Sequence, residues 1–452
     1  MAATGQAFGS GSNQFPGLKA TPDKYTSLGD LLEYNKPDNM DLYVKTYGDQ
    51  GITGFLELTG AKKNAGTSDQ IQYWEEGRLH NSFIATLPVG TTAYTSVTLT
   101  VPSGKGPRLN DVLYDQTSGE RLLVDEVVTE GGTTVSVRAM GGNGTFAATN
   151  GGRFSVIGNI SAQGGSQPTQ FYQTDITKRD QTFVIARETF HVNGSQATNI
   201  GWINTGNGDY RWYVKGEMDT RKRFMDQREM LMILGEQTAA AITSADNDGI
   251  VGTEGYFSAL ENRGIISDAF GSVTDFSEID DIILELDAQG APSEYAMYVN
   301  RTVSLNVDDM LASGITGAGS ITSGLASQFG AFNNSPEMAV NLGFKSFTRG
   351  GYTFHKHDWK LLNDPTLLGS NGIYKGAMVP MTTVADARTG ERAPSLQMYF
   401  KDAGGYSREM NHWVEGGDVL GFRTNDQDVA KFHYRSECCL VTRAANQHVL
   451  LK

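Results

Sequence analysis

Alternating apolar and polar residues mark two segments that lie far apart in the first half of the chain. Between residues 68 and 87, apolar side chains such as Ile71 and Phe83 are separated by charged ones. Between residues 170 and 192, phenylalanines and isoleucines alternate with threonines, and the segment ends at the turn dipeptide Asn193-Gly194. Alternation with a period of two is typical of strands that bury one face, so both segments are predicted to be strands.

The segment enclosed by these strands, residues 93–159, consists almost entirely of short apolar runs and glycine-containing turns. Val97, Leu99 and Val101 alternate with threonines, and further runs follow at spacings of about ten residues. Regular short strands with turns between them are typical of small barrels and sandwiches. We therefore expect an inserted β-barrel or sandwich domain that folds on its own core.

A helical pattern follows from Asp209, a candidate N-cap, to residue 242. Met218, Met225 and Met232 recur every seven residues, while most of the remaining positions are charged or polar. The spacing predicts a helix over 209–242, about 45 Å long, whose methionines form a single buried stripe against a sheet.

The second half of the chain mixes helices and strands. The spacing of isoleucines after Ser277 predicts a helix that ends at Gly290. A strand over 295–299 and a helix over 301–312 are expected next, and strands dominate again from residue 338. The order of these elements indicates an α+β fold.

Residues 1–51 show neither a helical nor a strand pattern. They are mostly small and polar, with prolines and scattered aromatic residues such as Phe8 and Tyr25. Such a segment cannot build its own core. It is predicted to be an extended arm that docks on the rest of the protein or on a neighbouring subunit.

Charge and cysteine content narrow the classes of function. The chain has 37 Lys and Arg against 51 Asp and Glu among 452 residues, a net charge of −14, which is the wrong sign for a surface that grips phosphate backbones. Its two cysteines, Cys438 and Cys439, are adjacent and provide neither a disulfide framework nor a zinc cluster. The N-terminal residues lack the pattern of a secretory signal, and no apolar run is long enough to span a membrane.

Candidate chemistry is sparse. His355 and His357 share one face of a predicted strand without a third metal ligand nearby, and Asp246-Asn247-Asp248-Gly249 lacks the acids that would complete a calcium loop. The phosphate-binding loop and the nucleophile elbow are both missing from the sequence. No catalytic, cofactor-binding or metal residues are therefore predicted, and the chain is not expected to be an enzyme.

The order of an arm, a split strand pair, a long helix, a mixed α/β part and C-terminal strands resembles the major capsid proteins of tailed bacteriophages, which have the Hong Kong 97-like fold. The resemblance covers essentially the whole chain. It implies an N-terminal arm over 1–51, an extended loop over 52–92 and 160–195, an inserted domain over 93–159, a peripheral domain over 196–264 and 395–452 with a spine helix over 209–242, and an axial domain over 265–394.

The resemblance also implies the function and the partners. The protein would self-assemble as hexamers and pentamers into an icosahedral shell that encloses double-stranded DNA without sequence-specific binding. Portal, scaffolding and decoration proteins would be its further partners, and it would reside in the virion after assembly in the host cytoplasm. Two alternatives stay open: a β-rich tail or surface adhesin component of a virion, and a carbohydrate-active enzyme, which would need a pair of carboxylates in a cleft.

Deletion of residues 1–51 should leave a soluble subunit that cannot form closed shells, because the aromatic residues of the arm have no core of their own. Electron microscopy and sedimentation of the truncated protein test this expectation. Normal particles from the truncated chain would contradict it.

Overall fold

The structure, a computed structural model, describes residues 62–64, 68–87, 96–102, 106–127, 133–141, 150–168, 171–197, 212–238, 249–268, 276–316, 346–366, 368, 372–385, 392–402, 406–417 and 423–452. These residues divide into two compact units, residues 73–179 and the rest of the chain. The predicted arm over 1–51 lies outside the described residues.

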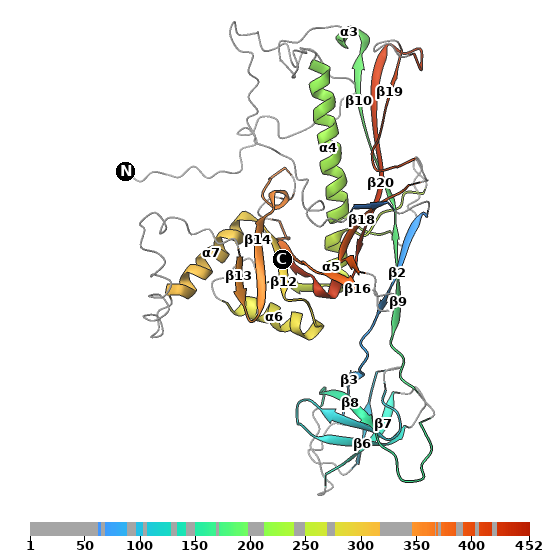
Figure 1. The fold of residues 1–452 in the computed structure, drawn as a ribbon, viewed down its shortest axis with the longest axis vertical. Coiled ribbons are helices and arrows are strands. Elements are labelled where there is room, and N and C mark those ends of the chain that lie inside the picture. The colour runs from blue at the N-terminus through green and yellow to red at the C-terminus, as the bar shows by residue number, and fades with distance from the viewer. Residues whose placement is uncertain are drawn as a thin grey trace. The chain divides into compact units, whose positions relative to one another are not determined.

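The larger unit contains a five-stranded sheet built around one long strand, β20 (Val429–Thr442). β20 pairs antiparallel with β10 (Val184–Asn193) on one edge and with β18 (Leu396–Phe400) and β19 (Asn411–Gly416) on the other. β1 (Lys62–Asn64) joins β18 in parallel. The helix α4 (Trp212–Leu234) runs along β10 and β20 (Figure 1), so the two layers bury one face of the sheet.

In a second, six-stranded sheet, the central strands are buried on both faces. Its strands, in order, are β11 (Ile265–Ser267), β21 (Val449–Leu451), β15 (Gly376–Pro380), β12 (Glu294–Val299), β14 (Tyr352–Asp358) and β13 (Ser346–Arg349). Tyr295, Met297 and Val299 of β12 pack in a core with α6 (Ser277–Gln289) and α7 (Arg301–Thr316). Ala296 and Tyr298 belong to a different core on the opposite face, which explains the continuous apolar run of this strand.

Short elements complete the described chain. Two two-stranded sheets are formed by β16 (Thr383–Ala385) with β17 (Arg392–Pro394) and by β2 (Gln70–Glu76) with β9 (Ile176–Thr182). The short helices are α3 (Gly194–Ala197), α5 (Tyr256–Arg263) and the 3-10 turns Lys360–Leu362 and Ala445–Gln447. Among the described helices, none has the length and apolar character required to cross a membrane.

The segments predicted as peripheral and axial domains share one core. Met232 and Ile233 of α4 pack in it together with Tyr298 of β12 and Leu440 of β20. The C-terminal strand β21, predicted in the peripheral part, lies between β11 and β15 of the second sheet. Residues 265 and 395 therefore do not separate two independent cores, because strand pairing and shared burial join the two parts into a single compact unit.

The helix α4 ends eight residues before the predicted position 242. Its 23 residues give a length of about 34 Å instead of 45 Å. At Gly235 the carbonyl oxygen accepts a hydrogen bond from the Gly255 N–H at 2.8 Å, and a Cβ atom there would lie 2.4 Å from the Leu231 oxygen. The chain turns away at this close backbone approach, which only glycine allows. Asp209, the predicted N-cap, lies outside the described residues.

The predicted apolar face and C-terminal end of the helix near Ser277 are confirmed, but Ser277, a candidate N-cap, is the first helical residue and Phe276 is the N-cap. α6 ends at Gly290, which adopts the left-handed conformation with φ of 64°, as a terminal glycine commonly does. All four apolar residues at core spacing are buried: Ile279, Ile282, Ile283 and Leu286. Local periodicity was sufficient here because the whole apolar face of the helix packs on one sheet.

The smaller unit contains a six-stranded antiparallel sheet. Its strands, in order, are β3 (Ser82–Ile84), β8 (Arg153–Asn159), β5 (Asp111–Asp115), β6 (Arg121–Val127), β7 (Thr134–Ala139) and β4 (Ser96–Thr100). Thr86, just after β3, exchanges two backbone hydrogen bonds of 3.0 Å with Thr100 of β4. These bonds join the first and last strands, so the sheet closes into a small barrel (Figure 1).

The barrel begins earlier in the chain than residue 93. Phe83 is 3% exposed and its ring stacks on Phe154 with centroids 6.1 Å apart. Ala85 and Leu87 are buried in the same core. The predicted boundary at 93 is therefore too late, because a strand assigned to the extended loop supplies one edge of the barrel.

The barrel also extends beyond residue 159. The buried carboxylate of Asp111 accepts hydrogen bonds from the Arg108 backbone N–H at 2.8 Å, from Asn159 Nδ2 at 2.9 Å and from the Tyr172 hydroxyl. Burial and the neighbouring Asp111 raise the pKa of Tyr172 to about 12. Tyr172 therefore stays protonated at neutral pH and donates a hydrogen bond to the Asp111 carboxylate, which needs such partners because it is buried.

A fragment of residues 73–179 should fold by itself, whereas residues 93–159 alone should not, because they lack Phe83 and Tyr172. Amide dispersion in NMR spectra of the two fragments measures the difference. Within the longer fragment, Phe83→Ala should cost about 3–5 kcal/mol. Ile84→Ala, at an exposed neighbouring position, should stay within about 0.5 kcal/mol. A well-dispersed spectrum from residues 93–159 would refute the revised boundaries.

Candidate functional site

The helix α4 buries one face against the sheet of β10 and β20. Phe224 is 1% exposed, and its ring lies 6.0 Å from that of Tyr434 on β20. The Tyr434 hydroxyl donates to Glu217 on the same helix. Phe190 of β10 approaches the helix at Gly216, where a Cβ atom would lie 2.8 Å from its ring. Aromatic residues therefore hold the helix in place.

The three methionines predicted as a buried stripe do not share one environment. Met232 is fully buried in the core, Met225 is half-buried, and Met218 is 56% exposed. The buried face of the helix instead includes Thr220, Phe224 and Ile233. None of these residues is on the seven-residue repeat of the methionines. A seven-residue repeat drifts by only about 20° per heptad on a straight helix, so the difference arises mainly because Met232 lies over the core shared with the second sheet and Met218 does not.

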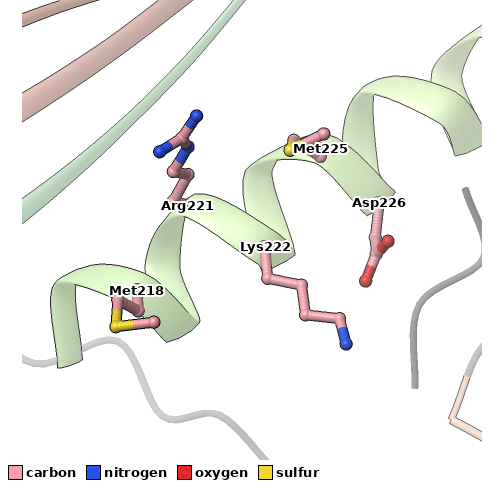
Figure 2. Close-up of a pocket in the computed structure, with 5 residues that line it drawn as sticks. All are labelled: Met218, Arg221, Lys222, Met225 and Asp226. Atoms are coloured by element: carbon pink, nitrogen blue, oxygen red, sulfur yellow. The ribbon is translucent and has the colours of Figure 1, made fainter. Parts of the chain in front are cut away.

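Met218 and Met225 lie on the outer side of α4, in an open hollow of about 360 Å³ that is also lined by Arg221, Lys222 and Asp226. Figure 2 shows Lys222 and Asp226 extending to one side of the helix and Arg221 to the other. Flexible methionines bordered by both signs of charge are suited to contacting a protein surface. We call these five residues the helix hollow.

The basic residues of α4 lie in two environments. Arg228 donates to the Glu409 carbonyl at 3.1 Å and lies 5.3 Å from the centre of the Phe400 ring. It therefore links the helix to the sheet, while Arg221 and Lys222 remain at the hollow.

The ribbon formed by β2 and β9 has large apolar side chains in solvent. Trp74 is 63% exposed and Ile176 is 56% exposed. Its polar contacts join β2 to β9 and to the residues just before β9. Arg179 Nε lies 3.1 Å from Glu75 Oε2, and the Thr174 hydroxyl donates to Glu76 at 2.8 Å. Among the described residues no third strand or helix covers these side chains, and a two-stranded sheet without a covering layer is only marginally stable in water. Its alternation was visible in the sequence, but its lack of cover was not.

The candidate metal ligands His355 and His357 each contact a different neighbouring side chain. His355 Nε2 lies 3.2 Å from Glu294 Oε1, and the His357 ring stacks on Tyr298 with centroids 5.2 Å apart. No group of ligands suited to a metal ion occurs among the described residues. Cys438 and Cys439 are buried free thiols, and burial raises the pKa of Cys438 to about 11, which suppresses its reactive thiolate.

Comparison with known proteins gives structural likenesses only. No family model matches the chain, and no curated protein does. A structure from Gordonia phage Cozz matches with a TM-score of 0.41 and 7% sequence identity, over 95% of this chain and 96% of that one. The mature capsid of bacteriophage PhiM1 matches with a TM-score of 0.38 and 10% identity, over 93% and 91% of the two chains. The capsid of cyanophage P-SCSP1u matches with a TM-score of 0.38 and 8% identity, over 95% and 98%.

These solved structures are phage structures, two of them capsids. TM-scores below 0.5 do not assign a function by themselves. The function of this chain is therefore inferred from its own exposed surfaces.

The burial of α4 predicts a large loss of stability for one substitution and almost none for another. Phe224→Ala should lower the free energy of unfolding by about 3–5 kcal/mol, because it leaves a cavity between helix and sheet. Met218→Ala should change it by no more than about 0.5 kcal/mol, since this side chain is mostly in solvent. Denaturant unfolding of the dilute protein measures both. Similar losses for the two variants would contradict the assignment of the buried face.

Proposed function

We propose that this protein is the structural subunit of a tailed-bacteriophage capsid, which assembles into the icosahedral shell around the double-stranded DNA genome. The observation that carries the proposal is the presence of large apolar side chains in solvent on the ribbon of β2 and β9 and on the outer side of α4. Trp74 and Ile176 on the ribbon and Met218 on α4 are the examples. Such surface on a well-packed chain usually marks contact with other proteins.

The arrangement of elements supports the same proposal. In this interpretation, the ribbon of β2 and β9 is the extended loop and α4 is the spine helix of a Hong Kong 97-like fold. The barrel within residues 73–179 is an inserted domain. The six-stranded sheet with α6 and α7 corresponds to the axial part, although it shares its core with the peripheral part.

The charge of the chain suits a container for DNA. At −14 per chain, the shell would repel phosphate groups in general and would hold DNA by enclosure rather than by tight cationic binding. Hexamers and pentamers of this chain would be its principal assemblies, with portal, scaffolding and decoration proteins as further partners. The mature subunit would reside in the virion after assembly in the host cytoplasm.

The function is tested by concentrating the purified full-length protein and examining it by negative-stain electron microscopy and sedimentation. Shells, or rings and sheets of subunits, are expected. A protein that stays monomeric at high concentration, with and without co-expressed phage assembly proteins, would overturn the proposal.

Trp74→Ala should raise the protein concentration required for assembly at least about tenfold, because a tryptophan buried at an interface often contributes about 2 kcal/mol or more. Gln72→Ala, an exposed polar position on the same face of β2, is the matched control and should assemble normally. Light scattering against protein concentration measures both. Equal assembly of the two variants would remove the ribbon from the interface.

A further inference from the structure

Two strands of the larger unit, β10 and β20, place their basic residues on one face. Strand register sets Arg187 of β10 opposite Arg435 of β20, and sets His191 opposite Lys431 two rows further along. His433 lies in the row between them, beside Trp413 of β19. The other face of these strands carries Phe190, Phe432 and Tyr434 against α4, so the basic residues of β10 and β20 point away from the helix, whereas His412 of β19 lies on the helix side.

This face is short of negative charge. Like charges directly opposite each other on neighbouring strands are destabilising, and Arg187 and Arg435 have this arrangement. Burial, Lys431 and His433 together lower the pKa of His191. In the rows of Arg187, His433 and Lys431 the only carboxylate is Glu415, whose Oε2 lies 3.6 Å from His433 Nε2. Glu437, opposite Ile185 in the next row, is already paired with Lys401 and Arg408.

The same face also offers apolar contact area at fixed positions. Trp413 is 38% exposed, with the His433 ring stacked on it at 5.0 Å and the Arg435 guanidinium 5.2 Å from its centre. Ile185, two residues before Arg187, is 45% exposed. We call Ile185, Arg187, Lys431, His433, Arg435 and Trp413 the cationic face.

A surface of the opposite character lies on α6. Asp281, Leu284 and Glu285 are spaced so that they share the solvent side of the helix, and Leu284 is 66% exposed. The neighbouring acids are engaged within the chain, since Asp280 pairs with Arg349 and Asp287 accepts from the Tyr352 hydroxyl at 2.6 Å. We call Asp281, Leu284 and Glu285 the acidic face.

We propose that the cationic face of one subunit docks on the acidic face of α6 in a second copy of this chain. The inference rests on the proposed capsid function. Copies that each carry −14 repel one another, so close packing is favoured where a local positive surface meets a negative one. Both faces combine charge with an exposed apolar side chain, Trp413 on one and Leu284 on the other. The net charge of the chain favours this occupant over nucleic acid.

Charge reversal tests the contact in the full-length protein. Arg187→Glu and Asp281→Lys, made separately, should each raise the concentration required for assembly at least about tenfold at low ionic strength, because each places like charges across the interface. The double variant R187E/D281K restores opposite charges and should return to within about threefold of the original protein, as coupled positions do. Added salt should reduce the differences.

Arg392→Glu on β17 and Asp426→Lys are the matched controls, because both side chains are exposed and lie outside the two faces. Thermal unfolding of dilute subunits checks that every variant folds. If R187E or D281K assembles at the same protein concentration as its control, the docking inference is wrong but the proposed function stands. The same holds if the folded double variant does not regain assembly. Normal assembly with weaker DNA retention in R187E would assign the cationic face to phosphate groups and also overturn it. Absence of assembly by the unmodified protein would overturn the proposed function.

Discussion

The pairing of β20 is the constraint on which the larger unit depends. Its C-terminal half is buried throughout, and a buried strand has to place its peptide N–H and C=O groups in hydrogen bonds. The partners that satisfy them, β10, β18 and β19, come from distant parts of the sequence. On one face, Phe432 and Tyr434 hold α4, while Cys438 and Leu440 enter the core shared with the second sheet. The position of the helix and the union of the two sheets both follow from this strand.

Alternation along the same strand has a second consequence. Because successive side chains point to opposite faces, the residues between the aromatic ones, Lys431, His433 and Arg435, are forced to the other side. Packing of the helix on one face therefore assembles positive charge on the other. Core formation and the proposed contact between subunits are in this way two results of one strand register.

The single chain leaves apolar surface uncovered where it has the least core to stabilise it. The ribbon of β2 and β9 and the outer side of α4 carry Trp74, Ile176 and Met218 in solvent. The barrel within residues 73–179 closes its own sheet around a buried core, although Ile157 and Phe171 are also in solvent. A subunit that is complete in some parts and incomplete in others is suited to a shell, where neighbours supply what each chain lacks.

Local pattern in the sequence determined the elements that depend on neighbours in the chain: the strands of the barrel and the apolar face and end of α6. Tertiary structure decided the rest. The end of α4 at Leu234 depends on the approach of Gly255 to Gly235, and the burial of Met232 but not Met218 depends on where the sheet lies beneath the helix. The start of the barrel depends on Phe83 meeting Phe154, and the cationic face depends on Arg187 meeting Arg435. These contacts join residues far apart in the chain, and hydrophobic periodicity reports only which side of an element is apolar, not what will cover it.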